Sequence, residues 1–277
     1  MKYFYQITYV FFLSLTLVLD FSLRHSYSFA EQLIDINLEK EINMGNFLIG
    51  LKQYLGKNKS DEDFLLMKTG NKFLRVKSAN GLDHQSKQVK IVFKKIPLEK
   101  SYVVEKLVSQ PFASFESAKR QSEILAKQGL NPIITMPSQW EIWLPIKYRD
   151  KVNEDFKIKR TTISSKIVPF LSNQYTFQKL DGPISIFSQD SIKINNISYG
   201  KNFYLIKDSY GTWTLVQKLS FGEYLKGVLP HEIGPNAPLE ALKSQAVIAR
   251  TWAIYNSDRF EADKFHLCIT TQCQVYK

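Results

Sequence analysis

The chain has 277 residues, of which 44% are hydrophobic, 13% aromatic and 23% charged. This composition is typical of a globular protein and excludes an intrinsically disordered chain, a collagen-like chain and a multi-span membrane protein. Lys and Arg together number 37 and Asp and Glu 26, a formal net charge of +11, which suits an anionic partner such as nucleic acid, a phospholipid surface or a cell-wall polymer.

Residues 1–30 have the pattern of a signal peptide. Lys2 supplies a positive start, residues 10–19 form an apolar run, and small residues surround a cleavage position after Ala30. We therefore expect export to the periplasm or cell envelope, with a retained membrane anchor as the alternative. Export argues against nucleic acid as the partner and favours an envelope polymer.

Residues 31–150 are expected to form a β-rich region, because short apolar runs alternate with turn signals such as Thr69-Gly70-Asn71. Ser114 and Gly129 delimit a predicted helix, with expected strands before it at 103–108 and after it at 132–135 and 140–145. With Pro111-Phe112-Ala113 in front of the helix, this β-α-β-β unit loosely resembles the SPOR type of glycan-binding repeat. The alternative is a small α/β subdomain without a ligand.

The charged segment that follows lacks hydrophobic periodicity, so we interpret residues 151–160 as a linker. A second domain is then expected over residues 161–277. Its first part, up to about Val216, has alternating apolar and polar residues typical of antiparallel strands. The fold class predicted for the whole chain is therefore α+β.

An acidic residue is expected on a turn between two helices. Ser220 and Glu223 have capping-box spacing at the start of the first helix, and Pro230 is expected to end it. Glu232 follows, and the next helix begins near Pro238 with a stripe of small apolar residues. Apolar neighbours are expected to bury Glu232 and favour its protonated form, which a general acid needs; these neighbours are Leu229, Pro230 and Ile233.

Three stretches of this region, residues 223–232 (EYLKGVLPHE), 238–253 and 273–276 (CQVY), resemble the stage II sporulation protein D (SpoIID) and amidase-enhancer family. The resemblance implies an exported peptidoglycan-acting protein, and in the best-studied members a lytic transglycosylase acting on glycan strands. It implies that Glu232 is catalytic and that Arg250 is required. We also assign His231 and Gln245 to substrate binding.

Other functions remain open beside the lytic transglycosylase. One is a noncatalytic wall-binding protein that stimulates an N-acetylmuramoyl-L-alanine amidase. Another is an inactive member, because relatives continue past the position of Lys277 with strands and a Ser-Gly-Gly loop, so we expect the SpoIID-like domain to be incomplete at its C-terminus.

No cofactor is expected, and Cys268 and Cys273 are only weak candidates for zinc ligands. A structural zinc takes four ligands, and Gln272 stands where zinc-binding relatives have His. His231, Asp263 and the nearby His266 do not complete a recognisable spacing. The alternatives for the two cysteines are a disulfide or free thiols.

Overall fold

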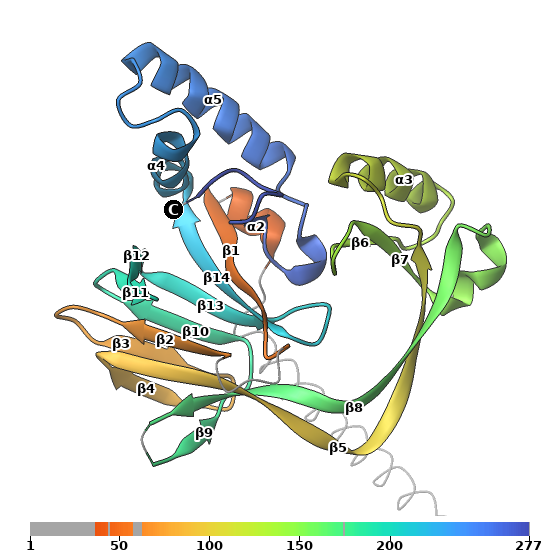
Figure 1. The fold of residues 1–277 in the computed structure, drawn as a ribbon, viewed down its shortest axis with the longest axis horizontal. Helices are drawn as coiled ribbons and strands as arrows, with labels where there is room; N and C mark the ends of the chain where they lie inside the picture. The colour runs from red at the N-terminus through yellow and green to blue at the C-terminus, as the bar shows by residue number, and fades with distance from the viewer. Residues whose placement is uncertain (1–36, 44, 58–62, 174, 277) are drawn as a thin grey trace, which may run out of the picture. The chain divides into compact units, whose positions relative to one another are not determined.

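The structure is a computed structural model that describes residues 37–43, 45–57, 63–173 and 175–276. The described residues from Leu38 onward form one compact unit with an α+β fold (Figure 1). The expected signal peptide, residues 1–30, lies outside the described residues. No helix in the described ranges is long and apolar enough to span a membrane.

Seven strands of the described chain form a first sheet, in the order β15-β1-β14-β13-β10-β3-β4. Neighbouring strands are antiparallel, except that β15 runs parallel to β1. The bounds are Asn46–Leu55 (β1), Leu74–Lys77 (β3), Asp83–Ser86 (β4), Ile184–Ser188 (β10), Asn202–Lys207 (β13), Trp213–Ser220 (β14) and Leu267–Cys268 (β15).

The second sheet of the described chain has the order β12-β11-β2-β5-β7-β6, with β8 paired to β5 and to β9. All of its pairings are antiparallel. The bounds are Phe64–Lys68 (β2), Gln88–Ser109 (β5), Ile133–Thr135 (β6), Glu141–Pro145 (β7), Phe156–Ser172 (β8), Phe177–Lys179 (β9), Ile192–Ile194 (β11) and Ile197–Tyr199 (β12).

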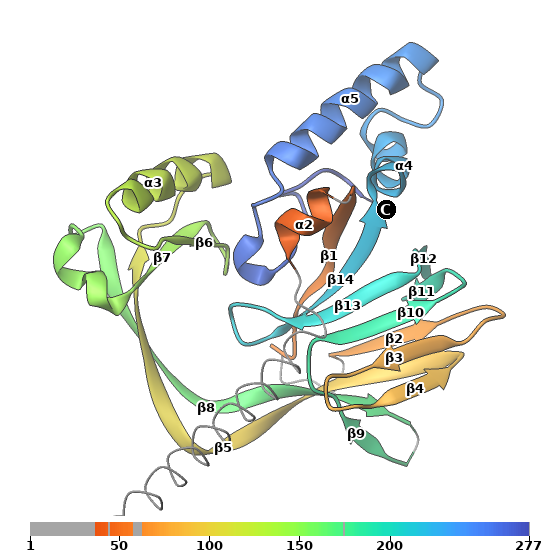
Figure 2. The same cartoon turned by 180° about the vertical axis from the view of Figure 1, so that it is seen from behind.

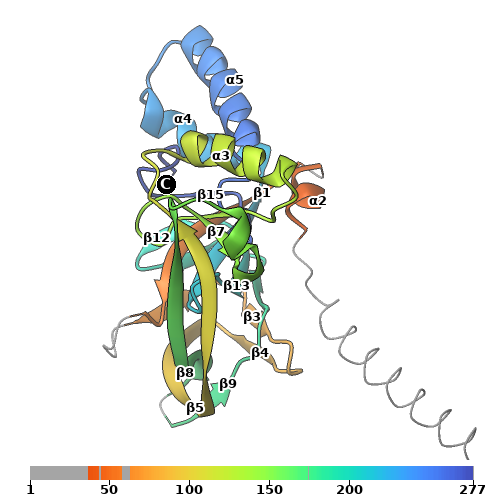
Figure 3. The ribbon, with the colours of Figure 1, turned by 90° about the vertical axis from the view of Figure 1, so that its right-hand side faces the viewer.

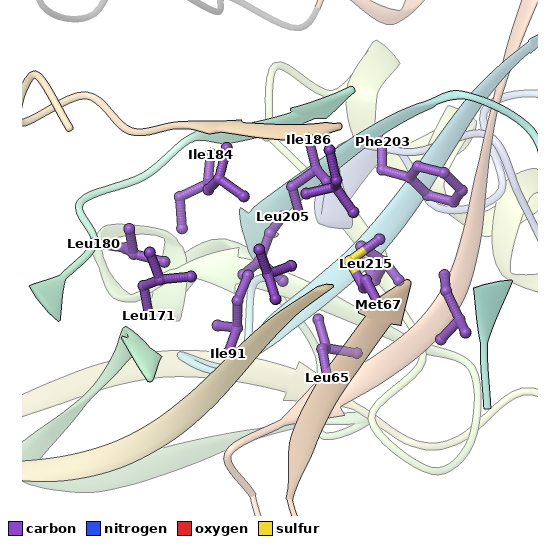
Figure 4. Packing of buried hydrophobic residues seen from close by; sticks show 14 of the residues in the cluster. Leu65, Met67, Ile91, Leu171, Leu180, Ile184, Ile186, Phe203, Leu205 and Leu215 are labelled. Atoms are coloured by element: carbon purple, nitrogen blue, oxygen red, sulfur yellow. The ribbon is translucent and has the colours of Figure 1, made fainter. Parts of the chain in front are cut away.

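Side chains from both sheets meet in one large hydrophobic cluster (Figure 4). In β10 the residues are alternately buried and partly exposed, as expected when one face of an antiparallel strand lies on a core. The cluster includes Leu65, Met67, Ile91, Leu171, Leu180, Ile184, Ile186, Phe203, Leu205 and Leu215. This core holds the two sheets together.

Strands β5 and β8 form a long antiparallel ribbon, whose pairing runs from Lys90↔Ser172 to Ser109↔Phe156 (Figure 3). Residues 151–160, interpreted from the sequence as a linker, include the start of β8. A short 3-10 helix (η2, Ile146–Lys151) connects β7 to it. Because most side chains in the middle of the ribbon are exposed on both faces, these strands lack the apolar alternation that marks half-buried strands.

The predicted β-α-β-β unit is present at the end of this ribbon. Helix α3 spans Phe115–Lys127, with Ser114 at the N-cap in a capping box and Gly129 at φ +75° just past the end. The helix packs on β5, β6 and β7 through a small core that contains Leu107, Leu125 and Ile142.

Helices α2 (Leu38–Asn43), α4 (Phe221–Glu232) and α5 (Leu239–Tyr255) lie beside the β1 and β14 end of the first sheet (Figure 2). Their shared core is separate from the core between the sheets. It contains Phe47 of β1, Tyr224 and Val228 of α4, and Ala249 and Ala253 of α5. A 3-10 helix, η3 (Glu261–Asp263), leads from α5 toward β15.

One buried arginine joins the α3 unit to the chain that follows α5. Nη2 of Arg259 donates hydrogen bonds to Oε1 of Glu116 at 2.6 Å and to Oδ1 of Asn256 at 2.7 Å. Its guanidinium carbon lies 4.6 Å from the ring centroid of Phe115 and 5.6 Å from that of Trp140. Only 5% of the residue is exposed. The cation therefore connects two elements that lie far apart in the sequence.

His266 is buried next to α2 and uses both ring nitrogens. Nδ1 accepts a hydrogen bond of 2.8 Å from the N–H of Leu48, so the proton of the neutral ring is on Nε2, which donates to the carbonyl of Leu38 at 3.0 Å. Burial lowers the pKa of His266 below 6.5. The folded state therefore favours the neutral ring.

We expect this histidine to make the folded state less stable in acid. Because its pKa is lower when folded than when unfolded, the stabilisation is complete above about pH 6.5 and is lost as the pH falls below that value. Chemical denaturation at several pH values should show the loss, and His266→Asn, which keeps an acceptor for Leu48, should flatten this part of the profile. Identical pH profiles for the two proteins would contradict the assignment.

Candidate functional site

Helix α4 starts where the sequence predicts. The hydroxyl of Ser220 accepts a hydrogen bond from the N–H of Glu223, and the carboxylate of Glu223 accepts one of 2.7 Å from the N–H of Ser220. These reciprocal bonds satisfy two backbone donors that a helix start otherwise leaves unpaired. The cap places the start of the helix directly after β14, and so sets the position of the residues further along it.

The end of α4 differs from the prediction. Pro230 lies inside the helix, which continues to Glu232, whereas the sequence pattern predicts a helix end at Pro230 and a turn at Glu232. A proline interrupts a helix through its missing N–H and its clash with the preceding turn. Here only two helical residues follow it, so few further bonds are affected, and the N–H of Ile233 still bonds to the carbonyl of Leu229 at 3.2 Å.

Glu232 is exposed, and the expected burial by its apolar neighbours is not found. Ile233 is itself exposed, and Leu229 instead packs against the core shared by α4 and α5. The carboxylate is nevertheless held in place, because the N–H of Val275 donates a hydrogen bond of 2.8 Å to Oε1. Within the described ranges Oε2 accepts no hydrogen bond, and the residue as a whole is exposed.

The segment that holds Glu232, residues 270–276, runs along α4. The hydroxyl of Tyr224 donates a hydrogen bond of 2.8 Å to Oε1 of Gln274, and the rings of Tyr224 and Tyr276 stack with centroids 5.9 Å apart. The hydroxyl of Tyr276 bonds to Gln217 of β14. Two stretches noted separately in the sequence, EYLKGVLPHE and CQVY, are thus in direct contact.

Sequence reasoning missed the roles of Gln274 and Val275. Val275 contributes its backbone N–H, which any residue except proline supplies, so its side chain carries no signal of the role. The available signal was the resemblance itself, since both stretches belong to the same matching pattern. Contact between two segments 43 residues apart is not readable from local periodicity.

Helix α5 carries Arg250 and Gln245. Its small-residue stripe is buried at Ala249 and Ala253, as predicted, whereas Leu239 is 65% exposed. Arg250 is exposed, and in the described structure it forms no ion pair with Glu232. The carboxylate of Glu232 instead accepts its hydrogen bond from Val275. Gln245 is half-buried. By the helical repeat of about 3.6 residues, Arg250 and Gln245 flank the buried stripe on opposite sides.

The other predicted substrate-binding residue, His231, is exposed near the end of α4. Its Nδ1 lies 3.0 Å from the carbonyl oxygen of Gly227, so this nitrogen carries the proton when the contact is a hydrogen bond. The ring then presents Nε2 as an acceptor to solvent. The structure thus brings His231 and Glu232 together at one helix end, and Glu232 and Val275 into contact.

The face of α5 opposite its buried stripe also carries apolar side chains. The sequence predicts only the buried stripe and not this second apolar face. Val247 and Tyr255 are 64% and 68% exposed, and Ile248 and Ile254 are exposed as well. A helix of a globular protein usually presents polar residues on its solvent face. In the described residues nothing covers these side chains.

The side chains that could join the two cysteines in binding zinc have other partners within the described ranges. Both cysteines are free thiols, and a structural zinc takes four ligands. Both nitrogens of His266 are used by the backbone, and the carboxylate of Asp263 accepts a hydrogen bond from the N–H of Ser209. Within the described ranges no group of three or more His, Cys, Asp or Glu side chains is placed to hold a metal ion.

A capped helix that ends in an exposed carboxylate, followed by a second helix with a buried stripe of small residues, characterises this part of the chain. Residues 209–277 match the family model SpoIID, a stage II sporulation protein. This match confirms the resemblance to SpoIID for this part of the chain, and it includes β14, α4, α5 and the 270–276 segment. A peptidoglycan-related role is what the assignment implies.

The chain is also similar to an uncharacterised protein of Brachyspira hyodysenteriae (strain ATCC 49526 / WA1). The two are 43% identical over 91 residues, which is 32% of this chain and 24% of that protein. The similar stretch therefore covers about a quarter of the relative's length. No solved structure matches the chain significantly.

Proposed function

We propose that this protein is exported to the cell envelope and acts there on peptidoglycan as a lytic transglycosylase. The observation that carries the proposal is the hydrogen bond from Val275 to Oε1 of Glu232, because it fixes a carboxyl group at an exposed helix end inside the SpoIID match. The signal-like pattern of residues 1–30 supports export, and the net charge of +11 suits an anionic wall polymer.

The chemistry requires only one carboxyl group. Glu232 in its acid form donates a proton to the oxygen of the glycosidic bond as that bond breaks through an oxocarbenium-like state. The resulting carboxylate then takes the proton of the C6 hydroxyl of the same muramic acid, whose oxygen closes a 1,6-anhydro ring. Because Oε1 is engaged by Val275, Oε2 is the oxygen that exchanges the proton.

Because Glu232 is exposed, the bound glycan itself must shield the carboxyl group from water. A glycan strand bound over the end of α4 removes water from the carboxyl group, and loss of water favours the neutral acid over the carboxylate. Arg250, exposed on α5, pairs with an acidic group of the glycan, while His231 and Gln245 donate or accept hydrogen bonds to its hydroxyls. The burial that the free protein lacks is thus supplied by the ligand.

A noncatalytic wall-binding function, with stimulation of an amidase, is the second candidate. It is favoured by the basic surface of the β5–β8 ribbon, where Lys106 lies directly opposite Lys159 and Lys157 lies opposite Val108. Burial, together with the charge of Lys159, lowers the pKa of Lys106 to about 8. Like charges placed directly opposite are destabilising, and a bound anion would relieve the repulsion.

Incubation of the purified full chain with insoluble glycan strands, stripped of stem peptides, separates the two candidates. A lytic transglycosylase releases soluble fragments in proportion to time and protein. A wall-binding protein sediments with the glycan and releases nothing, and it increases the rate of a separately added amidase. Failure both to release fragments and to sediment with the glycan would contradict both functions.

A further inference from the structure

The two cysteines lie against one another at the start of the segment that holds Glu232. Cys268 belongs to β15 and pairs with Gly50 of β1, so it is fixed to the first sheet. Cys273 closes a turn in which its N–H bonds to the carbonyl of Thr270 at 3.0 Å. The N–H of Cys268 lies 2.9 Å from Sγ of Cys273, which brings the sulfur of one residue onto the backbone of the other.

Each thiol changes the pKa of the other. The hydrogen bond from the Cys273 thiol lowers the pKa of Cys268 to about 7, and burial raises the pKa of Cys273. Sγ of Cys268 is also 3.1 Å from the hydroxyl of Thr270. One thiolate in the pair therefore forms near neutral pH, and a thiolate is the form that reacts with disulfides. Cys268 is buried, whereas Cys273 is half-buried.

We propose that Cys268 and Cys273 form a redox pair that closes to an intramolecular disulfide by exchange with a small-molecule disulfide such as oxidised glutathione. We favour a disulfide over zinc because, in the described part of the chain, no group of three or more His, Cys, Asp or Glu side chains is placed to hold a metal ion. Because Sγ of Cys273 already lies 2.9 Å from the backbone nitrogen of Cys268, closure needs little movement of the backbone.

The reaction begins at Cys273, which is the more exposed of the two. The Cys273 thiol passes its proton to the Cys268 thiolate, and the resulting Cys273 thiolate attacks one sulfur of the external disulfide, whose S–S bond breaks and releases one external thiolate. That thiolate takes the proton of Cys268. The Cys268 thiolate then attacks Sγ of Cys273 and displaces the second external thiolate. Two protein thiols are oxidised, and one external disulfide is reduced to two thiols.

The disulfide would fix the segment that contacts Glu232. Gln274 and Val275 directly follow Cys273, and they carry the hydrogen bonds to Tyr224 and Glu232. Joining Cys273 to β15 removes freedom from the start of this segment. The oxidised protein therefore holds Val275 against the end of α4 more firmly than the reduced protein does.

Alkylation and mass spectrometry of the full chain test the proposal. The reduced protein should have two alkylatable thiols. After treatment with oxidised glutathione it should have none, no retained glutathione, and a Cys268–Cys273 link in its peptide map. Cys268→Ser should keep a stable glutathione adduct on Cys273, and Cys273→Ser should react at least about tenfold more slowly, because the remaining thiol is buried.

Three results would overturn the redox pair: two thiols that stay alkylatable, a link between chains instead of within one, or one zinc ion per reduced chain that protects both thiols. Wild-type protein alone provides these readouts, so they stand even if a variant fails to fold. Hydrogen exchange of the Val275 amide should slow on oxidation, and an unchanged rate would overturn the effect on the segment. No glycan is used, so the result is independent of the proposed activity.

Discussion

Glu232→Gln is expected to abolish the release of soluble glycan fragments, with a loss of about a thousandfold, because general acid and base catalysis supplies an effect of that order. The variant should fold normally. The side chain is exposed, and the amide oxygen of Gln still accepts the hydrogen bond from the N–H of Val275. Gln has no acidic proton to donate to the glycosidic oxygen, so the substitution keeps the position of the side chain but removes the general acid. Fragment release is measured under single-turnover conditions.

Glu240→Gln provides the matched control. Glu240 lies in the first turn of α5, its side chain is 81% exposed, and its partner is the neighbouring Lys243. The same chemical change there should leave fragment release within about twofold of wild type, because an exposed pair of this kind contributes little. Sedimentation with glycan should be equal for wild type and Glu232→Gln. Activity of Glu232→Gln within a few fold of wild type would exclude Glu232 as the acid.

Arg259→Ala is expected to have the largest effect on stability, lowering the free energy of unfolding by about 3 kcal/mol. The substitution removes a buried cation that bonds to Glu116 and Asn256, and it leaves a cavity beside Phe115 and Trp140. Arg259→Lys keeps the charge but loses the planar fork that stacks on the aromatic rings, so we expect a smaller loss. Denaturant unfolding, with the slope compared between variants, measures both.

Glu116→Gln separates the contribution of the Arg259–Glu116 ion pair to stability from that of the packing of Arg259 on the aromatic rings. The side chain of Glu116 is 49% exposed, so water compensates its lost partner, and we expect a cost below about 1 kcal/mol. If Glu116→Gln costs as much as Arg259→Ala, the ion pair rather than the aromatic contacts stabilises this junction. If Arg259→Ala lowers the free energy of unfolding by less than about 1 kcal/mol, the contact of Arg259 with the α3 unit does not stabilise the fold.

Local signals in the sequence were sufficient for the elements whose ends are set by neighbouring residues. Helix α3 lies between the predicted Ser114 cap and Gly129, and α4 begins at the predicted capping box. Each of these features depends on hydrogen bonds or backbone angles within a few residues. The α+β class follows from the same alternation of turn signals and apolar runs.

Features that depend on distant residues were not predictable in this way. Strand β8 starts within the segment interpreted as a linker, because a ribbon solvated on both faces has no apolar alternation to read. Pro230 is tolerated in α4 because the helix ends soon after it. Glu232 is exposed although apolar residues flank it in the sequence, since Leu229 packs into the core shared by α4 and α5, and Ile233, just past the helix end, is itself exposed.

The chemical end group of the released fragments tests the central claim most directly. Mass spectrometry distinguishes a 1,6-anhydro end from a reducing end, because the anhydro product is lighter by one water. The mechanism at Glu232 predicts one new anhydro end for each glycosidic bond that wild-type protein breaks, and no new anhydro ends from Glu232→Gln. An increase in reducing ends during the reaction, or new anhydro ends formed at a similar rate by Glu232→Gln, would contradict it.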